Sequence, residues 1–166
     1  MSEITLLGIG NIILKDEGFG VWTIDRMQNR YEFPEQVQLL DGGTLGLELM
    51  RFVSGSKKML VIDAINGNGK PGDFFFFTGD QVQAYFQEKI SMHELGIQDV
   101  LSALQVVDEP IDEVIVMGVQ PFVVSPGIAM TPEMDAVVDK TIEIVLEQLK
   151  KWDVIPTLRK AESLPV

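Results

Sequence analysis

The chain has 166 residues, enough for one compact domain with a core of its own, and 46% of them are apolar. Its 25 Asp and Glu outnumber 13 Lys and Arg, and a net charge of −12 argues against binding nucleic acid or an anionic membrane, because both are held mainly by cationic side chains. The absence of cysteine excludes a disulfide framework, a thiolate metal site and a cysteine nucleophile.

Short apolar runs alternate along the chain with stretches of helical periodicity. The runs have the length of buried strands and cover residues 4–9, 37–40, 59–65, 73–78 and 114–119. Apolar positions recur at helical spacing over residues 17–30, 46–53, 80–89, 97–106 and 132–152. Strands that are apolar throughout and joined by helices predict a three-layer α/β/α fold, with a twisted, mostly parallel sheet of about five strands.

The domain organisation is expected to be simple. No repeat, low-complexity tract or linker divides the chain, so we predict one α/β domain over residues 1–153. Residues 154–166 hold two prolines and no clear period, and we expect a loose C-terminal tail there. No apolar run approaches the roughly 20 residues that cross a bilayer, and Met1-Ser2-Glu3 lacks the basic region of a signal peptide. We therefore expect a cytoplasmic protein without membrane insertion.

Acidic residues follow three of the expected strands. Ligands of an open parallel sheet bind outside the carboxyl ends of its strands, so Glu17, Asp41 and Asp63 should gather along one edge. Glu17 also suits a helix N-terminus, and Asp41, before two glycines, also suits a turn. Asp63 follows Leu-Val-Ile in a strand expected to be buried on both faces. An unpaired carboxylate is costly there, so Asp63 needs a cation or several hydrogen-bond donors.

His93 is the only histidine of the chain. A lone histidine is more often structural than functional, but carboxylates at neighbouring strand ends would complete a Glu/Asp/His set. Such a set suits a borderline divalent ion such as nickel, zinc or iron. The spacing along the sequence leaves open whether the three side chains meet.

Several other kinds of site are disfavoured. Gly8-x-Gly10 after the first strand resembles a dinucleotide fingerprint, but Ile13 stands where its third glycine belongs, and Asp16 and Glu17 would repel a pyrophosphate at the helix start. The chain has neither a Gly-x-Ser-x-Gly elbow nor a His-Glu-x-x-His helix. We therefore expect no organic cofactor, and a hydrolase of this sequence would use water activated by a carboxylate or a metal.

Five ordered sequence blocks resemble those of the hydrogenase maturation endopeptidases. They are Gly8-Ile9-Gly10-Asn11 with Asp16-Glu17-Gly18-Phe19-Gly20, then Asp41-Gly42-Gly43-Thr44-Leu45-Gly46, Val61-Ile62-Asp63-Ala64, Ser91-x-His93-x-x-Gly96 and Gly118-Val119-Gln120-Pro121. The blocks span roughly residues 4–150. The resemblance implies an α/β/α endopeptidase that removes the C-terminal extension of a nickel–iron hydrogenase large-subunit precursor after nickel insertion.

The resemblance also implies site residues. In this family a Glu or Asp after the first strand, an Asp after the third and a His form a metal-binding trio, which by position is Glu17, Asp63 and His93. The trio would contact nickel already held by the precursor, and Asp16 would be no ligand. Asp63 and Glu17 are also the catalytic candidates, with a likeness to aspartyl proteases that does not extend to an Asp-Thr-Gly pair.

Two questions of mechanism and function stay open at the level of sequence. A carboxylate could act as general base on water, or the metal could polarise the scissile carbonyl. Asp41, Gly42 and Gly43 would line a groove for the C-terminal strand of the substrate. The alternatives to the endopeptidase are a nickel chaperone or assembly partner that does not cut, and a metal-dependent hydrolase of small molecules.

Overall fold

The computed structural model describes residues 3–42, 52–90 and 111–159. Five strands of this part of the chain form the central sheet: β1 (Ile4–Gly8), β3 (Val37–Asp41), β4 (Lys58–Ala64), β5 (Phe74–Thr78) and β6 (Glu113–Val119). Their order is β3-β1-β4-β6-β5. Only β5 is antiparallel to its neighbour in this sheet, while the other pairs are parallel. The predicted mostly parallel sheet is confirmed.

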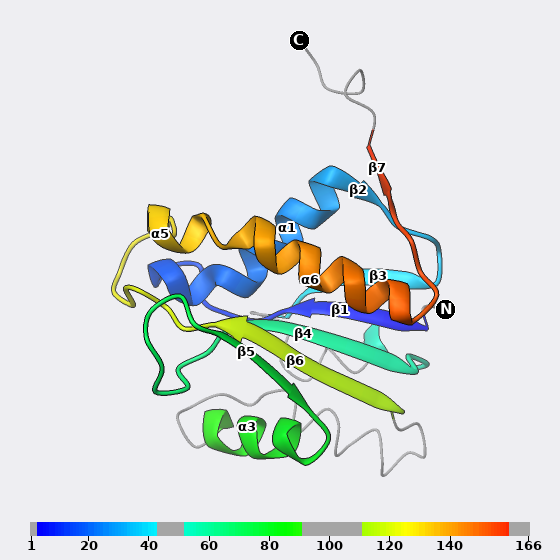
Figure 1. Cartoon of the computed structure of the whole chain (residues 1–166), viewed down its shortest axis with the longest axis horizontal. Coiled ribbons are helices and arrows are strands. Elements are labelled where there is room, and N and C mark those ends of the chain that lie inside the picture. The colour runs from blue at the N-terminus through cyan, green and yellow to red at the C-terminus, as the bar shows by residue number, and fades with distance from the viewer. Residues whose placement is uncertain (1–2, 43–51, 91–110, 160–166) are drawn as a thin grey trace.

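Helices cover both faces of the sheet (Figure 1). One face carries α1 (Phe19–Arg30), α5 (Pro132–Asp135) and α6 (Val138–Lys151), and the opposite face carries α3 (Asp80–Ile90). A short 3₁₀ helix, η1 (Lys15–Gly18), leads into α1. The fold is therefore the three-layer α/β/α arrangement expected from the alternation of apolar runs and helical stretches.

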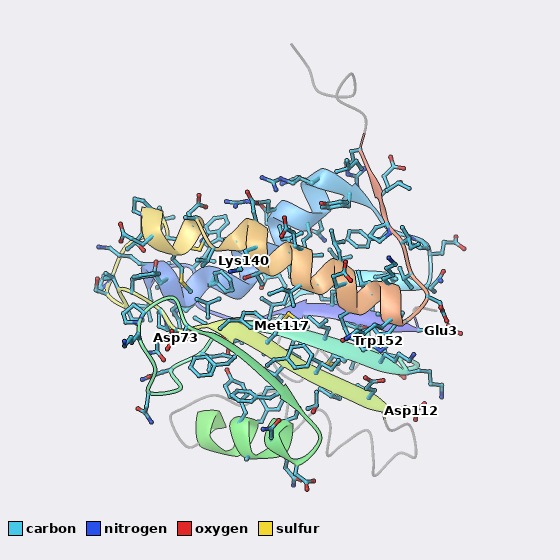
Figure 2. The ribbon with its side chains drawn as sticks, viewed as in Figure 1. Glu3, Asp73, Asp112, Met117, Lys140 and Trp152 are labelled. Carbon is cyan, nitrogen blue, oxygen red and sulfur yellow. The ribbon has the colours of Figure 1, made fainter. Side chains whose placement is uncertain are left out.

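The central strand β4 supplies side chains to the cores on both faces. Leu60 and Ile62 belong to the cluster under α1 and α6, whereas Met59 and Val61 belong to the cluster under α3. All four are fully buried, and burial of such a side chain contributes about 1.5–3 kcal/mol. Figure 2 shows the neighbouring Met117 of β6 between the sheet and α6, with Trp152 at the far end of that helix.

Glycine allows α1 to approach the sheet closely. A Cβ atom on Gly20 would collide with the carbonyl oxygens of Ile62 and Ile9, and one on Gly8 would collide with the carbonyl oxygen of Gly20. The first turn of α1 therefore lies directly against the carboxyl ends of β1 and β4. This contact brings η1, which carries Glu17, to the same edge of the sheet.

The predicted single helix over residues 132–152 is wrong, because the structure has two helices there. Thr131 accepts a hydrogen bond from the backbone N–H of Met134 and starts α5, but Val137 adopts φ −93° and ψ −3°. Its N–H donates to the carbonyl of Met134, three residues back, which tightens and ends the first helix. Val137 and Val138 are both β-branched, and such residues lose side-chain freedom within a helix.

The C-terminal stretch is also more ordered than expected. Val154 is 2% exposed, and the short strand β7 (Thr157–Leu158) pairs antiparallel with β2 (Tyr31–Glu32). The N–H of Arg159 donates to the carbonyl of Arg30 at 2.8 Å. The expectation of a loose tail is therefore wrong for residues 154–159, since backbone pairing of two short strands leaves no periodic signal. For residues 160–166, outside the described ranges, it stays a prediction.

Two expected helices cannot be compared with the structure. The helix predicted near residues 46–53 falls mostly outside the described residues, and the one predicted over 97–106 falls wholly outside them. Within the ranges that the structure covers, no helix combines the length and the apolar character needed to cross a membrane.

Candidate functional site

The carboxyl ends of β1, β3 and β4 lie level with one another at one edge of the sheet. Gly8 at the end of β1 pairs with Asp41 of β3 on one side and with Ile62 of β4 on the other. The next residue of β4 is Asp63, and η1 contacts this strand. The structure thus brings Asp41, Asp63 and the segment of Glu17 to a common edge, as the topology of the expected sheet predicts.

Asp63 is a fully buried carboxylate in the central strand. It pairs with Gly118 of β6, where a Cβ atom would collide with the carbonyl oxygen of Asp63. The hydroxyl of Tyr85, on α3, donates a hydrogen bond to its Oδ2 atom. Asp63 was expected to need a partner, and the phenol of Tyr85 is one such partner.

Tyr85 was not singled out from the sequence. The available signal is its position: with Val82 and Phe86 it forms an i, i+3, i+4 stripe, and those two residues are buried under the sheet. A tyrosine in such a stripe carries a polar tip into the core and needs an acceptor there. Nothing in the local sequence says that the acceptor is Asp63, 22 residues earlier.

Glu17 is half-buried in η1, and its backbone is tightly held. Its carbonyl accepts a hydrogen bond from the N–H of Asn11 at 3.3 Å, and its own N–H donates to the carbonyl of Leu14 at 3.2 Å. Gly10, at φ +143°, allows the backbone to come this close to Glu17, because a Cβ atom there would collide with the carbonyl oxygen of Glu17. The turn from β1 into η1 therefore sets the position of Glu17.

Asp16 has a different environment from its neighbour. Its side chain is fully buried and accepts hydrogen bonds from the N–H groups of Phe122, Val123 and Thr131 at 2.8–3.0 Å. The hydroxyl of Thr131 lies 3.0 Å from both of its oxygens. These bonds tie η1 to the 122–131 loop, so Asp16 serves the structure of the edge rather than ligand binding.

The predicted substrate groove is covered only in part by the described residues. Asp41 is exposed at the end of β3, an edge strand of the five-stranded sheet. The N–H of Gly42 donates to the carbonyl of Gly8 at 2.8 Å, and a Cβ atom on Gly42 would lie 2.6 Å from Cδ1 of Leu7. Gly42 is therefore required for close packing on β1. Gly43 lies outside the described residues.

Of the predicted metal-binding trio, Glu17 and Asp63 are described and His93 is not. The two carboxylates come from segments in contact, η1 and β4, and are hard oxygen donors. Within the described ranges, no cluster of three or more His, Cys, Asp or Glu is arranged to hold a metal ion. A borderline divalent ion at this edge would need a further donor, which is the role predicted for His93.

Gln120 organises the loop that follows Asp63 and β4. Its Oε1 atom accepts from the N–H groups of Gly67 and Gly69 at 2.9 and 3.1 Å, and its Nε2 atom donates to Oδ1 of Asn66 at 3.0 Å. Gln120 comes directly after β6, so one buried side chain fixes the 66–69 loop at the candidate edge. Gln120 lies in the last of the five sequence blocks, where the sequence alone does not indicate this role.

An open pocket of about 690 Å³ lies elsewhere on the molecule. It is lined by α1 and by the 128–135 segment, including Trp22, Arg26, Ile128 and Asp135. Neither Glu17 nor Asp63 lines it. The chemistry-bearing carboxylates therefore belong to the sheet edge and not to this pocket.

Comparison with known proteins gives consistent relatives. A family model described as hydrogenase maturation protease matches residues 21–148. The chain is 37% identical over 160 residues to the hydrogenase 2 maturation protease of Escherichia coli K12, covering 96% of this chain and 98% of that protein. It is 35% identical over 164 residues to the hydrogenase expression/formation protein HoxM of Cupriavidus necator, covering 98% and 81%. The solved structure of the hydrogenase maturating endopeptidase HybD from E. coli matches with a TM-score of 0.88 at 37% identity, covering 96% of this chain and 98% of that one.

Proposed function

The chain belongs to the hydrogenase maturation protease family and is a peptidase, and from that premise we propose that it removes the C-terminal extension of a nickel–iron hydrogenase large-subunit precursor after nickel insertion. The observation that carries the proposal is the fully buried Asp63 at the carboxyl end of the central strand. The segment of Glu17 contacts the same strand. Two carboxylates at the ligand-binding edge of a parallel sheet suit a hydrolytic site.

In this proposal Glu17, Asp63 and His93 contact the nickel that the precursor already holds. The nickel is thus part of the substrate and reports that the precursor has been loaded. The net charge of −12 favours a cationic partner of this kind. Because the carboxylates would lack that contact in a nickel-free precursor, such a precursor should bind weakly and remain uncut.

Two chemical routes are compatible with these residues. Asp63 or Glu17 takes a proton from water, the resulting hydroxide attacks the scissile carbonyl, and the proton passes to the leaving amine as the C–N bond breaks. Alternatively, the nickel of the substrate polarises the scissile carbonyl and lowers the barrier to attack by water. Both routes place the carboxylates beside the reacting atoms.

Asp41, Gly42 and Gly43 are proposed to bind the C-terminal strand of the precursor. In support, β3 is at an edge of the five-stranded sheet, and an extended peptide can add to such an edge through backbone hydrogen bonds. If Asp41 lines this groove, Asp41→Asn should weaken cleavage, and unchanged cleavage would count against the assignment.

The cytoplasmic location stays a prediction from the sequence.

The test is to incubate the protein with a nickel-loaded or a nickel-free precursor and to measure the mass of the precursor. We expect loss of one defined C-terminal peptide from the loaded precursor only. Asp63→Asn should slow this cleavage by about 10²–10⁴-fold if the carboxylate acts as general base. Asp112 is exposed and comes just before β6, at the opposite end of the strands from Asp63. Asp112→Asn is therefore the matched control and should cleave at the normal rate.

Other results would favour the alternatives. A stable complex with a loaded cognate precursor of unchanged mass would contradict the peptidase reaction and favour a nickel chaperone. Turnover of a free peptide or small molecule without any hydrogenase subunit would instead favour a metal-dependent hydrolase.

A further inference from the structure

Tyr85 joins α3 to the carboxylate on which the proposed function rests. Its hydroxyl donates to Oδ2 of Asp63, across the interface between helix and sheet. Its side chain is half-buried, so the hydrogen bond forms where water competes less than at the surface.

The ring of Tyr85 packs against two aromatic neighbours. Its centroid lies 5.6 Å from that of Phe77, with the ring planes tilted by 34°. The centroid of Phe86 lies 5.3 Å away, in an edge-to-face arrangement at 65°. Such pairs are favourable in themselves, so the ring keeps its place whether or not the hydroxyl is present. The hydroxyl is therefore a donor at a fixed point.

A fixed donor has a specific effect on a carboxylate. The last torsion of an aspartate is broad, so its two oxygens can occupy a range of orientations around the Cβ–Cγ bond. A hydrogen bond to one oxygen selects one orientation and, by the same step, sets where the other oxygen points. Partners of this kind orient metal-ligating carboxylates, and their removal typically costs about 10–100-fold in metal affinity or activity.

We propose that Tyr85 is a positioning residue, whose hydroxyl holds the carboxylate of Asp63 in the orientation that meets the metal centre of the precursor. This inference rests on the proposed function. It assigns to α3 a part in recognising the loaded precursor, through the Asp63 contact rather than by touching the substrate. Packing of α3 does not require the hydroxyl, because Val82 and Phe86 already bury that face of the helix.

The test compares affinity for two forms of one precursor. Tyr85→Phe keeps the ring and its contacts with Phe77 and Phe86, and removes only the hydroxyl. We expect the wild-type protein to bind nickel-loaded precursor more tightly than nickel-free precursor, and Y85F to reduce that ratio by about 10–100-fold. Tyr31→Phe, at the only other tyrosine of the chain, removes a hydroxyl far from Asp63 and should leave the ratio unchanged.

The ratio of the affinities for loaded and nickel-free precursor distinguishes a positioning role of Tyr85 from a general loss of stability. A weakened fold would lower binding of both precursor forms alike, and thermal unfolding of Y85F would reveal it. In an Asp63→Asn background the same Y85F change should have little further effect, because the carboxylate to be positioned is gone. An unchanged ratio in folded Y85F, with normal discrimination by the wild type, would overturn the role of Tyr85 alone. Absence of both discrimination and cleavage in the wild type would overturn the proposed function and this inference together.

Discussion

At the scale of single residues, two adjacent carboxylates have opposite environments. Asp16 is enclosed by three backbone N–H groups and a hydroxyl, whereas Glu17 is half-buried at the sheet edge. A buried carboxylate with this many donors stabilises the fold only while every donor keeps its acceptor. The geometry of Glu17 therefore depends on its buried neighbour Asp16.

Asp16→Asn should destabilise the protein by about 1–3 kcal/mol, because an amide nitrogen cannot accept and at least one buried N–H loses its partner. Urea denaturation, followed by circular dichroism, measures this loss as a lower midpoint. Asp112→Asn at an exposed site is the control and should leave the midpoint within about 0.5 kcal/mol of wild type. A wild-type midpoint for D16N would mean that the 122–131 loop is not tied through this side chain.

The sequence predicts some of these site residues but not their partners, for a physical reason. Asp63 lies near the end of an apolar strand and Glu17 lies in the segment that follows the first strand, and such positions are visible in the local pattern. The partners are not local: Tyr85 lies 22 residues beyond Asp63, and Thr131 lies 115 residues beyond Asp16. Contacts at such separations arise from the packing of the finished fold, which a single sequence does not display.

At the scale of elements, the docking of α1 depends on the absence of side chains. Gly20→Ala would ordinarily favour a helix by about 1 kcal/mol. Here the added methyl group would collide with the carbonyl oxygens of Ile62 and Ile9, so we expect a net loss of about 1–3 kcal/mol. Thermal unfolding measures the change. Asn29→Ala, on the exposed side of the same helix, should be neutral or slightly stabilising, and equal behaviour of the two variants would contradict close docking.

Ion pairs tie α1 to the C-terminal helices. Arg26 pairs with Asp135 and Asp139, and Arg30 lies 2.7 Å from Oδ1 of Asp139. Slight burial acts to raise the pKa of Asp139, but the hydrogen bonds and charges of Arg30 and Arg26 outweigh it, so the pKa is lowered. The two aspartates and Arg30 are largely exposed, and ion pairs at such positions contribute less than about 1 kcal/mol.

The lowered pKa of Asp139 determines how its contribution to the free energy of unfolding changes with pH. A carboxyl that is more acidic in the folded state stabilises the fold above its ordinary pKa of 3.8, and this contribution disappears as the pH falls through the folded value. Asp139→Asn should therefore lower the free energy of unfolding slightly at neutral pH and hardly at all in strong acid. Urea midpoints of both proteins across this range measure it, and a gap that widens in acid would show that the pair does not stabilise the fold.

The elements that the sequence predicted best are the strands of the central sheet. The predicted ranges of these five strands agree with the structure to within one or two residues, because each strand is a short, mainly apolar run. The helix over residues 132–152 was wrong, since α5 and α6 share one apolar face and only the turn at Val137 divides them. The β2–β7 pair was missed, because two residues per strand carry no period.

At the scale of the whole molecule, the candidate site and the C-terminal stretch lie at opposite ends of α1. Glu17 precedes the first residue of that helix, whereas β2, the partner of β7, follows its last residue. Figure 1 shows the β2–β7 ribbon at the end of the molecule where β1 begins. Stability and catalysis can therefore be separated by changing the C-terminal stretch.

Two truncations make this separation testable. Ending the chain after Asp153 removes Val154, which is 2% exposed, together with the β2–β7 pairing. Burial of such a side chain contributes about 1.5–3 kcal/mol, so this variant should unfold at a clearly lower urea concentration. Ending the chain after Arg159 keeps those contacts, and its midpoint should match wild type if residues 160–166 are loose, as predicted. Both variants should cleave a nickel-loaded precursor at the wild-type rate well below their unfolding temperatures, because the described part of the stretch pairs with β2, at the other end of α1 from Glu17. Loss of cleavage in the variant that ends after Arg159, with its stability intact, would instead place the last seven residues in substrate binding.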